Sequence, residues 1–186
     1  MKRNGIVYVA LLFLCITMLS GCWSKKELTD LAFVIAVGLD KTEDGKYAVI
    51  FQIVNPGNVA GTTQRGGGSG GVPISLCKAT GDTLLEASRK GSKKVSRLIY
   101  YAHTNLLVIG EELAKEGIGG VLDVMERSNQ FRTTTMVVIA QHHTAEDVLK
   151  VLTPIDKIPA NEIIKTLKFS EKIWGQTVRV NIGEVI

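Results

Sequence analysis

The residue with the clearest chemistry in this sequence is Cys22, which follows an apolar run from Ile6 to Leu19. Two cationic residues, Lys2 and Arg3, precede the run, and two small residues separate it from the cysteine. A charged start, an apolar middle and a small-residue end are typical of a secretory signal that is removed from the mature protein. The pattern therefore predicts that the rest of the chain is exported.

The tetrapeptide Leu19-Ser20-Gly21-Cys22 at the end of this signal resembles the bacterial lipobox. The resemblance implies that the Cys22 thiol receives a diacylglycerol, that residues 1–21 are cleaved off, and that the new terminus is N-acylated. Two acyl signals hold a protein stably on a membrane, at about 0.8 kcal/mol per buried methylene. The alternative is an uncleaved transmembrane helix, but a run of 14 residues is short for the roughly 20 that a span needs.

Composition limits what the exported part can do. The chain of 186 residues carries 22 basic and 18 acidic side chains, and the signal takes two of the basic ones, which leaves 20 against 18. A net charge of about +2 gives no argument for binding nucleic acid. Of three cysteines only Cys77 remains beside Cys22 after cleavage, so no disulfide framework is expected and a buried thiol is favoured for Cys77.

Beyond a tether of residues 22–30, apolar strand patterns alternate with helix patterns, as in a sheet covered by helices. We expect a mixed α/β fold in which an N-terminal β-hairpin joins a mixed sheet of about five strands with helices packed on it. The expected strands are 31–39, 47–54, 72–78, 98–109 as one long or two short strands, 134–140, and a further start at 176–180. One expected helix begins at Thr83. Others run from Glu111 to Arg127, from Thr144 to Leu152, and over about 160–173.

Two patterns imitate binding motifs. Gly66, Gly68 and Gly71 satisfy G-x-G-x-x-G, but that fingerprint needs a strand before it and a helix after it. Polar residues precede this run and a strand pattern follows, so residues 61–71 are predicted to be a flexible loop. His142-His143 could suggest a metal, but adjacent strand residues point to opposite faces and no partner stands at a zinc-like spacing.

The remaining polar residues form no catalytic set. No P-loop and no G-x-S-x-G elbow occurs in the sequence. His103 is better explained by a local hydrogen bond at a strand break than by a role as a catalytic base. Lys93, Lys94 and Arg97 form a basic cluster at a helix end, for which a solvated face is the first interpretation and contact with lipid head groups or a partner the second. We therefore expect that the protein is not an enzyme and that it binds neither a cofactor nor a metal ion.

Many short motifs in order resemble the Ger(x)C spore germination lipoproteins, and the resemblance covers essentially the whole chain. They are Cys22-Trp23, Glu27-Leu28, Gly38-Leu39-Asp40-Lys41, Gln52-Ile53-Val54-Asn55-Pro56, the Gly-rich insertion, Ala79-Thr80-Gly81-Asp82-Thr83-Leu84, His103, Val108-Ile109-Gly110-Glu111-Glu112-Leu113-Ala114, Ala145-Glu146-Asp147 and Ile158-Pro159-Ala160.

The resemblance implies the C subunit of a nutrient germinant receptor, with residues 31–186 as the N-terminal domain of that family. Such a lipoprotein lies on the outer face of the spore's inner membrane, beside integral-membrane A and B subunits. Family members are roughly twice as long, so this chain is expected to lack the later domains. Whether the domain contacts the small-molecule germinant stays open.

Three hypotheses follow. The first is a non-enzymatic receptor subunit that acts through protein contacts, with 110–127 or the Gly-rich loop as expected contact surfaces. The second is a solute-binding lipoprotein of a nutrient uptake system, which would need a cleft between two lobes. The third is a truncated fragment without independent activity.

Overall fold

The computed structural model describes residues 4–5, 7–8, 12–13, 27, 30–56, 59, 72–128, 130–151, 156–175 and 178–185. Residues 31–186 form one compact unit, and residues 1–30 belong to another. The strands and helices that follow belong to residues 31–186.

Strand β1 (Leu31–Lys41) is the centre of the sheet. It pairs antiparallel with β2 (Tyr47–Val54), which confirms the predicted hairpin. The short β4 (Leu98–Tyr100) pairs in parallel with residues 31–33 of β1, and β5 (Leu106–Gly110) pairs in parallel with residues 36–39 of β1. The strand runs two residues beyond the predicted end at Leu39, because Asp40 and Lys41 still pair with β2.

The other strands extend the sheet in the order β3-β2-β1-β5-β6-β7. They are β3 (Ile74–Gly81), β6 (Met136–Ala140), which is parallel to β5, and the antiparallel edge strand β7 (Val180–Asn181). The mixed sheet confirms the predicted α/β class. The described residues hold seven strands rather than about five, because the stretch 98–109 divides into two and the two-residue β7 closes one edge.

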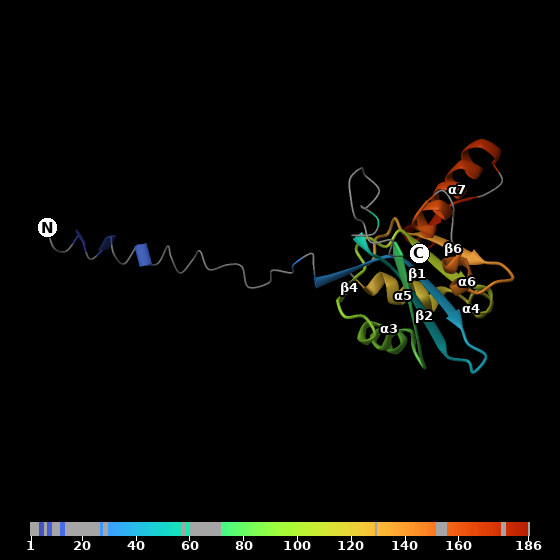
Figure 1. The fold of residues 1–186 in the computed structure, drawn as a ribbon, viewed down its shortest axis with the longest axis horizontal. Coiled ribbons are helices and arrows are strands. Elements are labelled where there is room, and N and C mark those ends of the chain that lie inside the picture. Colours follow the sequence, from blue (N-terminus) through green and yellow to red (C-terminus); the bar gives the residue numbers. More distant parts are fainter. Residues whose placement is uncertain are drawn as a thin grey trace. The chain divides into compact units, whose positions relative to one another are not determined.

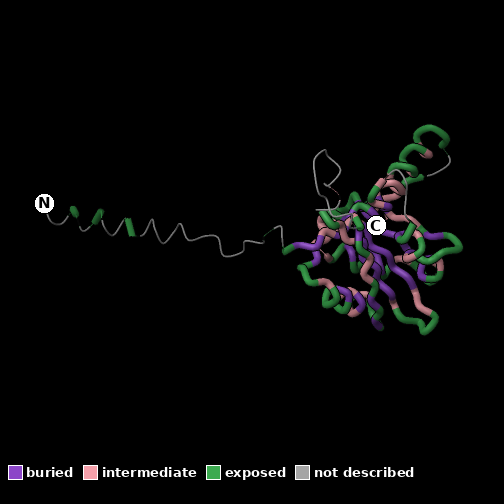
Figure 2. Tube along the Cα trace, in the orientation of Figure 1, coloured by how far each residue is buried: buried purple, intermediate pink, exposed green. Residues whose placement is uncertain are grey.

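Helices cover both faces of the sheet (Figure 1). One face carries α3 (Leu84–Lys93), α4 (Glu111–Glu116), α5 (Gly119–Arg127) and α8 (Ile182–Val185); the other carries α6 (Ala145–Lys150) and α7 (Pro159–Trp174). Figure 2 shows the strands between them as the most buried part of the chain. The largest fully buried apolar side chains are Phe51, Ile50, Leu106, Leu107, Ile109 and Leu149.

The predicted helix starts are formed by capping side chains. Thr83 Oγ1 accepts the Glu86 N–H at 3.1 Å, and the Glu86 carboxylate accepts the Asp82 N–H at 2.8 Å. Thr144 and Asp147 form a reciprocal capping box at α6. These side chains satisfy backbone donors that a helix start leaves unpaired. The predicted helix from Glu111 to Arg127 is instead two helices, because Gly117 adopts a φ of 109° between them.

Helix α7 projects from the sheet in Figure 1. Its first turns pack on the core through Ala160, Ile163 and Ile164, whereas Trp174 at its end is 71% exposed. Within the described residues, no helix combines the length and apolarity that crossing a bilayer requires.

Candidate functional site

The residues predicted to carry the lipid, Leu19, Ser20, Gly21 and Cys22, lie outside the described residues, as does the Gly-rich loop 61–71. The lipid attachment therefore stays a prediction. The first strand begins at Leu31, so the predicted tether leads directly into the amino end of β1. This divides the domain into two regions of interest: the ends of the parallel strands next to the tether and the ends away from it.

The carboxyl ends of β1, β5 and β6 meet at one side of the domain, which we call the carboxyl end (residues 40–46, 110–112 and 141–147). In α/β sheets this is where ligands commonly bind. A hollow of about 280 Å³ lies here, lined among others by Lys41, Glu112, His143 and Thr144. Its position makes it the first place to look for chemistry.

Asp40 is the most buried charged side chain of this region, with 6% of its surface exposed. Its Oδ1 accepts the Ala145 N–H at 2.7 Å and its Oδ2 accepts the Glu146 N–H at 3.2 Å. Burial raises the pKa of the Asp40 carboxyl, although these hydrogen bonds act in the opposite direction. The carboxylate is thus fully occupied in holding the first turn of α6 against the end of β1.

Gly110, at the end of β5, leaves the space that Asp40 fills. A Cβ added at Gly110 would lie 2.0 Å from Asp40 Oδ1, which is well inside van der Waals contact. The neighbouring parallel strand therefore needs glycine at this point because a buried carboxylate crosses its path to reach α6.

The other acids of the carboxyl end are paired as well. Glu111 accepts from Lys115 Nζ at 3.0 Å and from the backbone N–H of His142, and both interactions lower the pKa of Glu111. His142 adopts a φ of 60°, which turns its backbone toward Glu111 while its imidazole stays exposed. Lys41 pairs with Glu116 at 2.7 Å. Strand β6 ends at Ala140, and His142-His143 lie in the turn between it and α6. These groups stabilise turns rather than form a reactive site.

Gln52 is a second fully buried polar side chain, and it lies in the middle of β2. Its Nε2 donates to the Leu149 carbonyl at 3.1 Å, and its Oε1 accepts the Ala160 N–H at 3.4 Å. One amide therefore joins the end of α6 to the start of α7 and fixes both helices on the same face of the sheet.

The opposite side of the domain, which we call the amino end, comprises residues 31–33, 53–55, 75–77 and 93–103. Phe33, Tyr100 and His103 form an aromatic cluster with ring centroids 5.5 to 6.0 Å apart. His103 therefore contacts two rings, which is a packing role. The apolar side chain of Leu98 is 53% exposed beside this cluster.

A hollow of about 430 Å³ also lies at the amino end, lined by Ala32, Val54, Leu76, Lys94, Arg97 and their neighbours. Lys94 Nζ donates to the Lys78 carbonyl at 2.7 Å. Within the described residues, neither Lys93 nor Arg97 forms an ion pair, and both are exposed. The predicted basic cluster is therefore solvent-facing at this hollow.

Cys77 has the environment of a structural thiol. It is partly buried against the core, and its Sγ lies 3.7 Å from the Gly91 carbonyl oxygen. Among the described residues, no group of three or more His, Cys, Asp or Glu side chains is placed to hold a metal ion.

The segments that carry the family resemblance meet one another in space. The Asp40, Gly110 and Ala145 segments converge at the carboxyl end, and the Gln52 and Ala160 segments are joined by the buried amide. The sequence pattern ended the first strand before Asp40 and gave Gln52 no role of its own. It placed Gly110 at the start of an expected contact surface, 110–127, whereas Gly110 is buried at the end of β5. The signal that could have identified Gln52 is a polar residue inside an otherwise apolar strand pattern.

Comparison with known proteins gives a consistent result. The family described as "Spore germination protein N-terminal domain" matches residues 24–186. The chain is 50% identical over 187 residues to spore germination protein KC of Bacillus subtilis (strain 168), covering 100% of this chain and 46% of that protein. It is 25% identical over 182 residues to spore germination protein A3 of the same organism, covering 96% and 47%.

A third relative, spore germination protein YndF of Bacillus subtilis (strain 168), is 29% identical over 188 residues, covering 88% of this chain and 45% of that protein. The chain thus spans about half the length of the curated relatives it matches. No solved structure matches it.

Proposed function

Because this chain belongs to the spore germination protein N-terminal domain family, we propose that it is a membrane-anchored lipoprotein subunit of a spore nutrient germinant receptor. The observation that carries the proposal is the family match over residues 24–186, which begins just after the predicted lipidated residue, Cys22. The lipobox-like tetrapeptide supplies the anchor, and the similarity to spore germination protein KC supplies the process.

In this proposal the lipid on Cys22 confines the domain to the outer face of the spore inner membrane. Confinement raises the effective concentration of the domain near membrane-embedded A and B subunits without any additional contact. Recognition then depends on the surfaces of the folded domain. The exposed surfaces of α5 and of the end of α7 are available for such contacts.

We propose further that the domain acts through protein contacts and not through catalysis. The polar groups at the carboxyl end support this view, since Asp40 and Glu111 are engaged in hydrogen bonds that hold helices and turns. The fold also favours a receptor subunit over a solute-binding lipoprotein, since the described residues of 31–186 are arranged on one sheet and not in two lobes around a cleft.

The anchor is tested by replacing Cys22 with Ala in the full chain and separating membranes from the soluble fraction. We expect the Cys22→Ala variant to leave the membrane fraction. Cys77→Ala is the matched control, since Cys77 is a partly buried thiol that we assign to packing, and it should stay with the membrane. Unchanged membrane retention of the Cys22→Ala variant would overturn the anchor.

The germination role is tested by deleting the gene in its host and measuring germination on a panel of single nutrients. We expect a loss of response to at least one nutrient, which the intact gene restores and the Cys22→Ala gene does not. Normal germination on every nutrient of the panel would contradict the proposal.

A further inference from the structure

We infer that the amino end of the domain is a membrane-docking surface that lies on anionic phospholipid head groups. This inference rests on the lipid anchor proposed above and adds an orientation to it. The anchor alone would let the domain rotate freely, whereas a docking surface would hold one end against the bilayer.

The first argument is the path of the chain. The tether of residues 22–30 has nine residues, so it reaches at most roughly 30 Å when fully extended. It joins the domain at Leu31, the first residue of β1 and part of the amino end. The surface of the domain that can reach the bilayer with the least extension of the tether is therefore the amino end.

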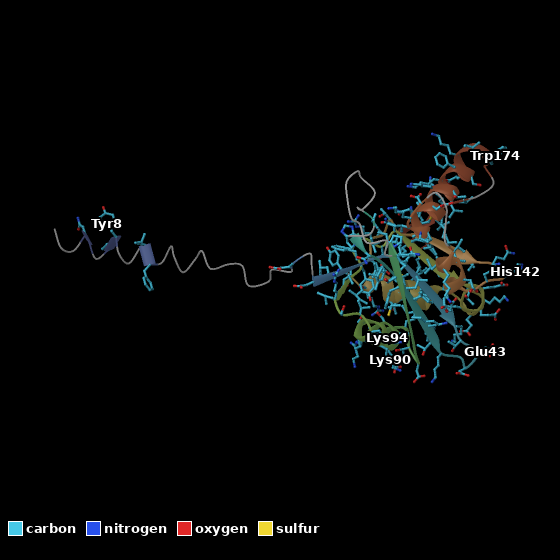
Figure 3. All side chains as sticks on the ribbon, viewed as in Figure 1. Tyr8, Glu43, Lys90, Lys94, His142 and Trp174 are labelled. Atoms are coloured by element: carbon cyan, nitrogen blue, oxygen red, sulfur yellow. The ribbon has the colours of Figure 1, made fainter. Side chains whose placement is uncertain are left out.

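The second argument is the difference in charge between the two ends. The amino end presents three cations near one another in the sequence: Lys93 is the last residue of α3, and Lys94 and Arg97 lie in the connection to β4. Within the described residues, Lys93 and Arg97 have no acidic partner, whereas the lysines of the carboxyl end, Lys41 and Lys46, are paired with Glu116 and Asp82. In Figure 3, Lys94 and Lys90 lie by α3, and Glu43 lies at the turn that follows β1.

The simplest explanation for the basic cluster is its position at the end of α3, where cations interact favourably with the helix dipole. That account covers Lys93 in the last turn of the helix. It leaves Arg97 unexplained, because Arg97 lies beyond the helix, on the rim of the 430 Å³ hollow. A cation on the rim of a hollow suits a phosphate group, and Arg binds phosphate with two parallel N–H donors.

The third argument is the apolar and aromatic surface beside the cations. Leu98 directly follows Arg97 and is 53% exposed. The Phe33 and Tyr100 rings lie on the paired strands β1 and β4, and the His103 ring packs against both from the turn after β4. Basic residues next to aromatic and aliphatic side chains are typical of proteins that rest at a bilayer interface. The amino end combines these features at the point where the tether enters.

The test uses the lipidated full chain, reconstituted into vesicles of phosphatidylcholine alone or of phosphatidylcholine with phosphatidylglycerol. Flotation of the vesicles reports the anchor, and hydrogen exchange of backbone amides reports the contact. On anionic vesicles we expect exchange in residues 93–98 to slow severalfold relative to neutral vesicles, while exchange in residues 42–46 at the carboxyl end stays the same.

The triple variant Lys93→Gln, Lys94→Gln, Arg97→Gln should float with the vesicles as before but lose the protection of residues 93–98. The matched control is Lys46→Gln, Lys115→Gln, Lys150→Gln, which removes the same charge elsewhere and should keep that protection. A chain that fails to float would overturn the anchor itself.

A chain that floats but shows equal exchange on both kinds of vesicle would overturn the docking surface and leave the anchor intact. Protection that is absent on anionic vesicles and arises only when the membrane-embedded subunits are added would also overturn it, in favour of a protein partner at this surface.

Discussion

The two ends of the central sheet use their charged residues in opposite ways. At the carboxyl end, Asp40 is buried and bonded to two backbone N–H groups of α6, and Glu111, Glu116 and Glu146 are each paired with a lysine. At the amino end, Lys93 and Arg97 are exposed and have no ion pair within the described residues. The end that resembles a ligand site by position is therefore structural, and the end next to the tether carries the chemistry available to a partner.

Position in the fold is therefore a weaker guide to a binding site than whether the polar side chains there are already paired. The carboxyl ends of parallel strands are the usual place for ligands, yet here the principal polar groups hold helices in place. If that account is correct, substitutions at the carboxyl end change stability, and substitutions at the amino end change binding and leave stability nearly unaltered.

The largest loss of stability is expected from Gly110→Ala. The new Cβ would lie 2.0 Å from Asp40 Oδ1, so the carboxylate must leave the Ala145 N–H or the strands must separate. Overpacking of this kind costs about 3 kcal/mol. Chemical denaturation measures the change. The matched control is Gly120→Ala in α5, where nothing lies within 4 Å of the added Cβ and helix propensity favours alanine; equal stabilities for the two variants would break the comparison.

The next largest loss is expected from Gln52→Leu. The substitution introduces an apolar side chain of similar size and leaves the Leu149 carbonyl and the Ala160 N–H without their partner. Leaving buried backbone groups unpaired costs about 2 kcal/mol. Hydrogen exchange should show faster opening of the start of α7 than of β1; uniform behaviour of both elements would contradict the bridging role.

A smaller loss is expected from Asp40→Ala, which removes the acceptor of the Ala145 and Glu146 N–H groups at the start of α6. Loss of such a cap costs about 1 kcal/mol. The thermal transition should shift downward by a few degrees. An unchanged transition would show that water replaces the carboxylate without cost.

Asp40 also predicts a dependence on pH. Burial raises the pKa of its carboxyl above the ordinary 3.8, so the folded protein holds this proton more tightly than the unfolded chain does. The contribution of Asp40 to stability therefore falls as the pH rises from about 3.8 through the raised folded value. Because Asp40→Asn removes the titration, the unfolding free energy of the wild type minus that of the variant should decrease over this window. An increase would contradict the sign.

The smallest effect on stability is expected at the amino end. The triple variant Lys93→Gln, Lys94→Gln, Arg97→Gln alters exposed side chains that make few contacts, so its free energy of unfolding should stay within about 0.5 kcal/mol of the wild type. Denaturation curves check this directly. A loss of several kcal/mol would contradict this prediction and would show that the cluster stabilises the end of α3.

Much of the fold could be predicted because its determinants are local. The hairpin follows from two apolar runs around a turn, and the starts of α3 and α6 follow from Thr83 with Glu86 and Thr144 with Asp147. Gly91 lies inside α3, where glycine is unfavourable, yet the helix is intact. The glycine instead leaves room for the Phe51 ring, whose Cε2 would lie 2.5 Å from an added Cβ.

The buried polar contacts could not be predicted in the same way. The bond between Asp40 and Ala145 spans 105 residues, and the bond between Gln52 and Ala160 spans 108. Nothing in the local pattern around Asp40 distinguishes a turn acid from a helix cap that is completed so far along the chain. The lipidation site has the opposite character, since its whole signal lies within the continuous stretch of residues 2–22.

The central claim is that Cys22 is the lipidated first residue of the mature chain. Mass spectrometry of the amino-terminal tryptic peptide from host membranes tests it most directly, because trypsin cuts after Lys25 and releases residues 22–25. We predict a peptide that begins at Cys22 and carries the added mass of a diacylglyceryl group and an N-acyl chain. A peptide that extends upstream of Cys22, or one whose Cys22 thiol reacts with an alkylating reagent, would contradict the claim.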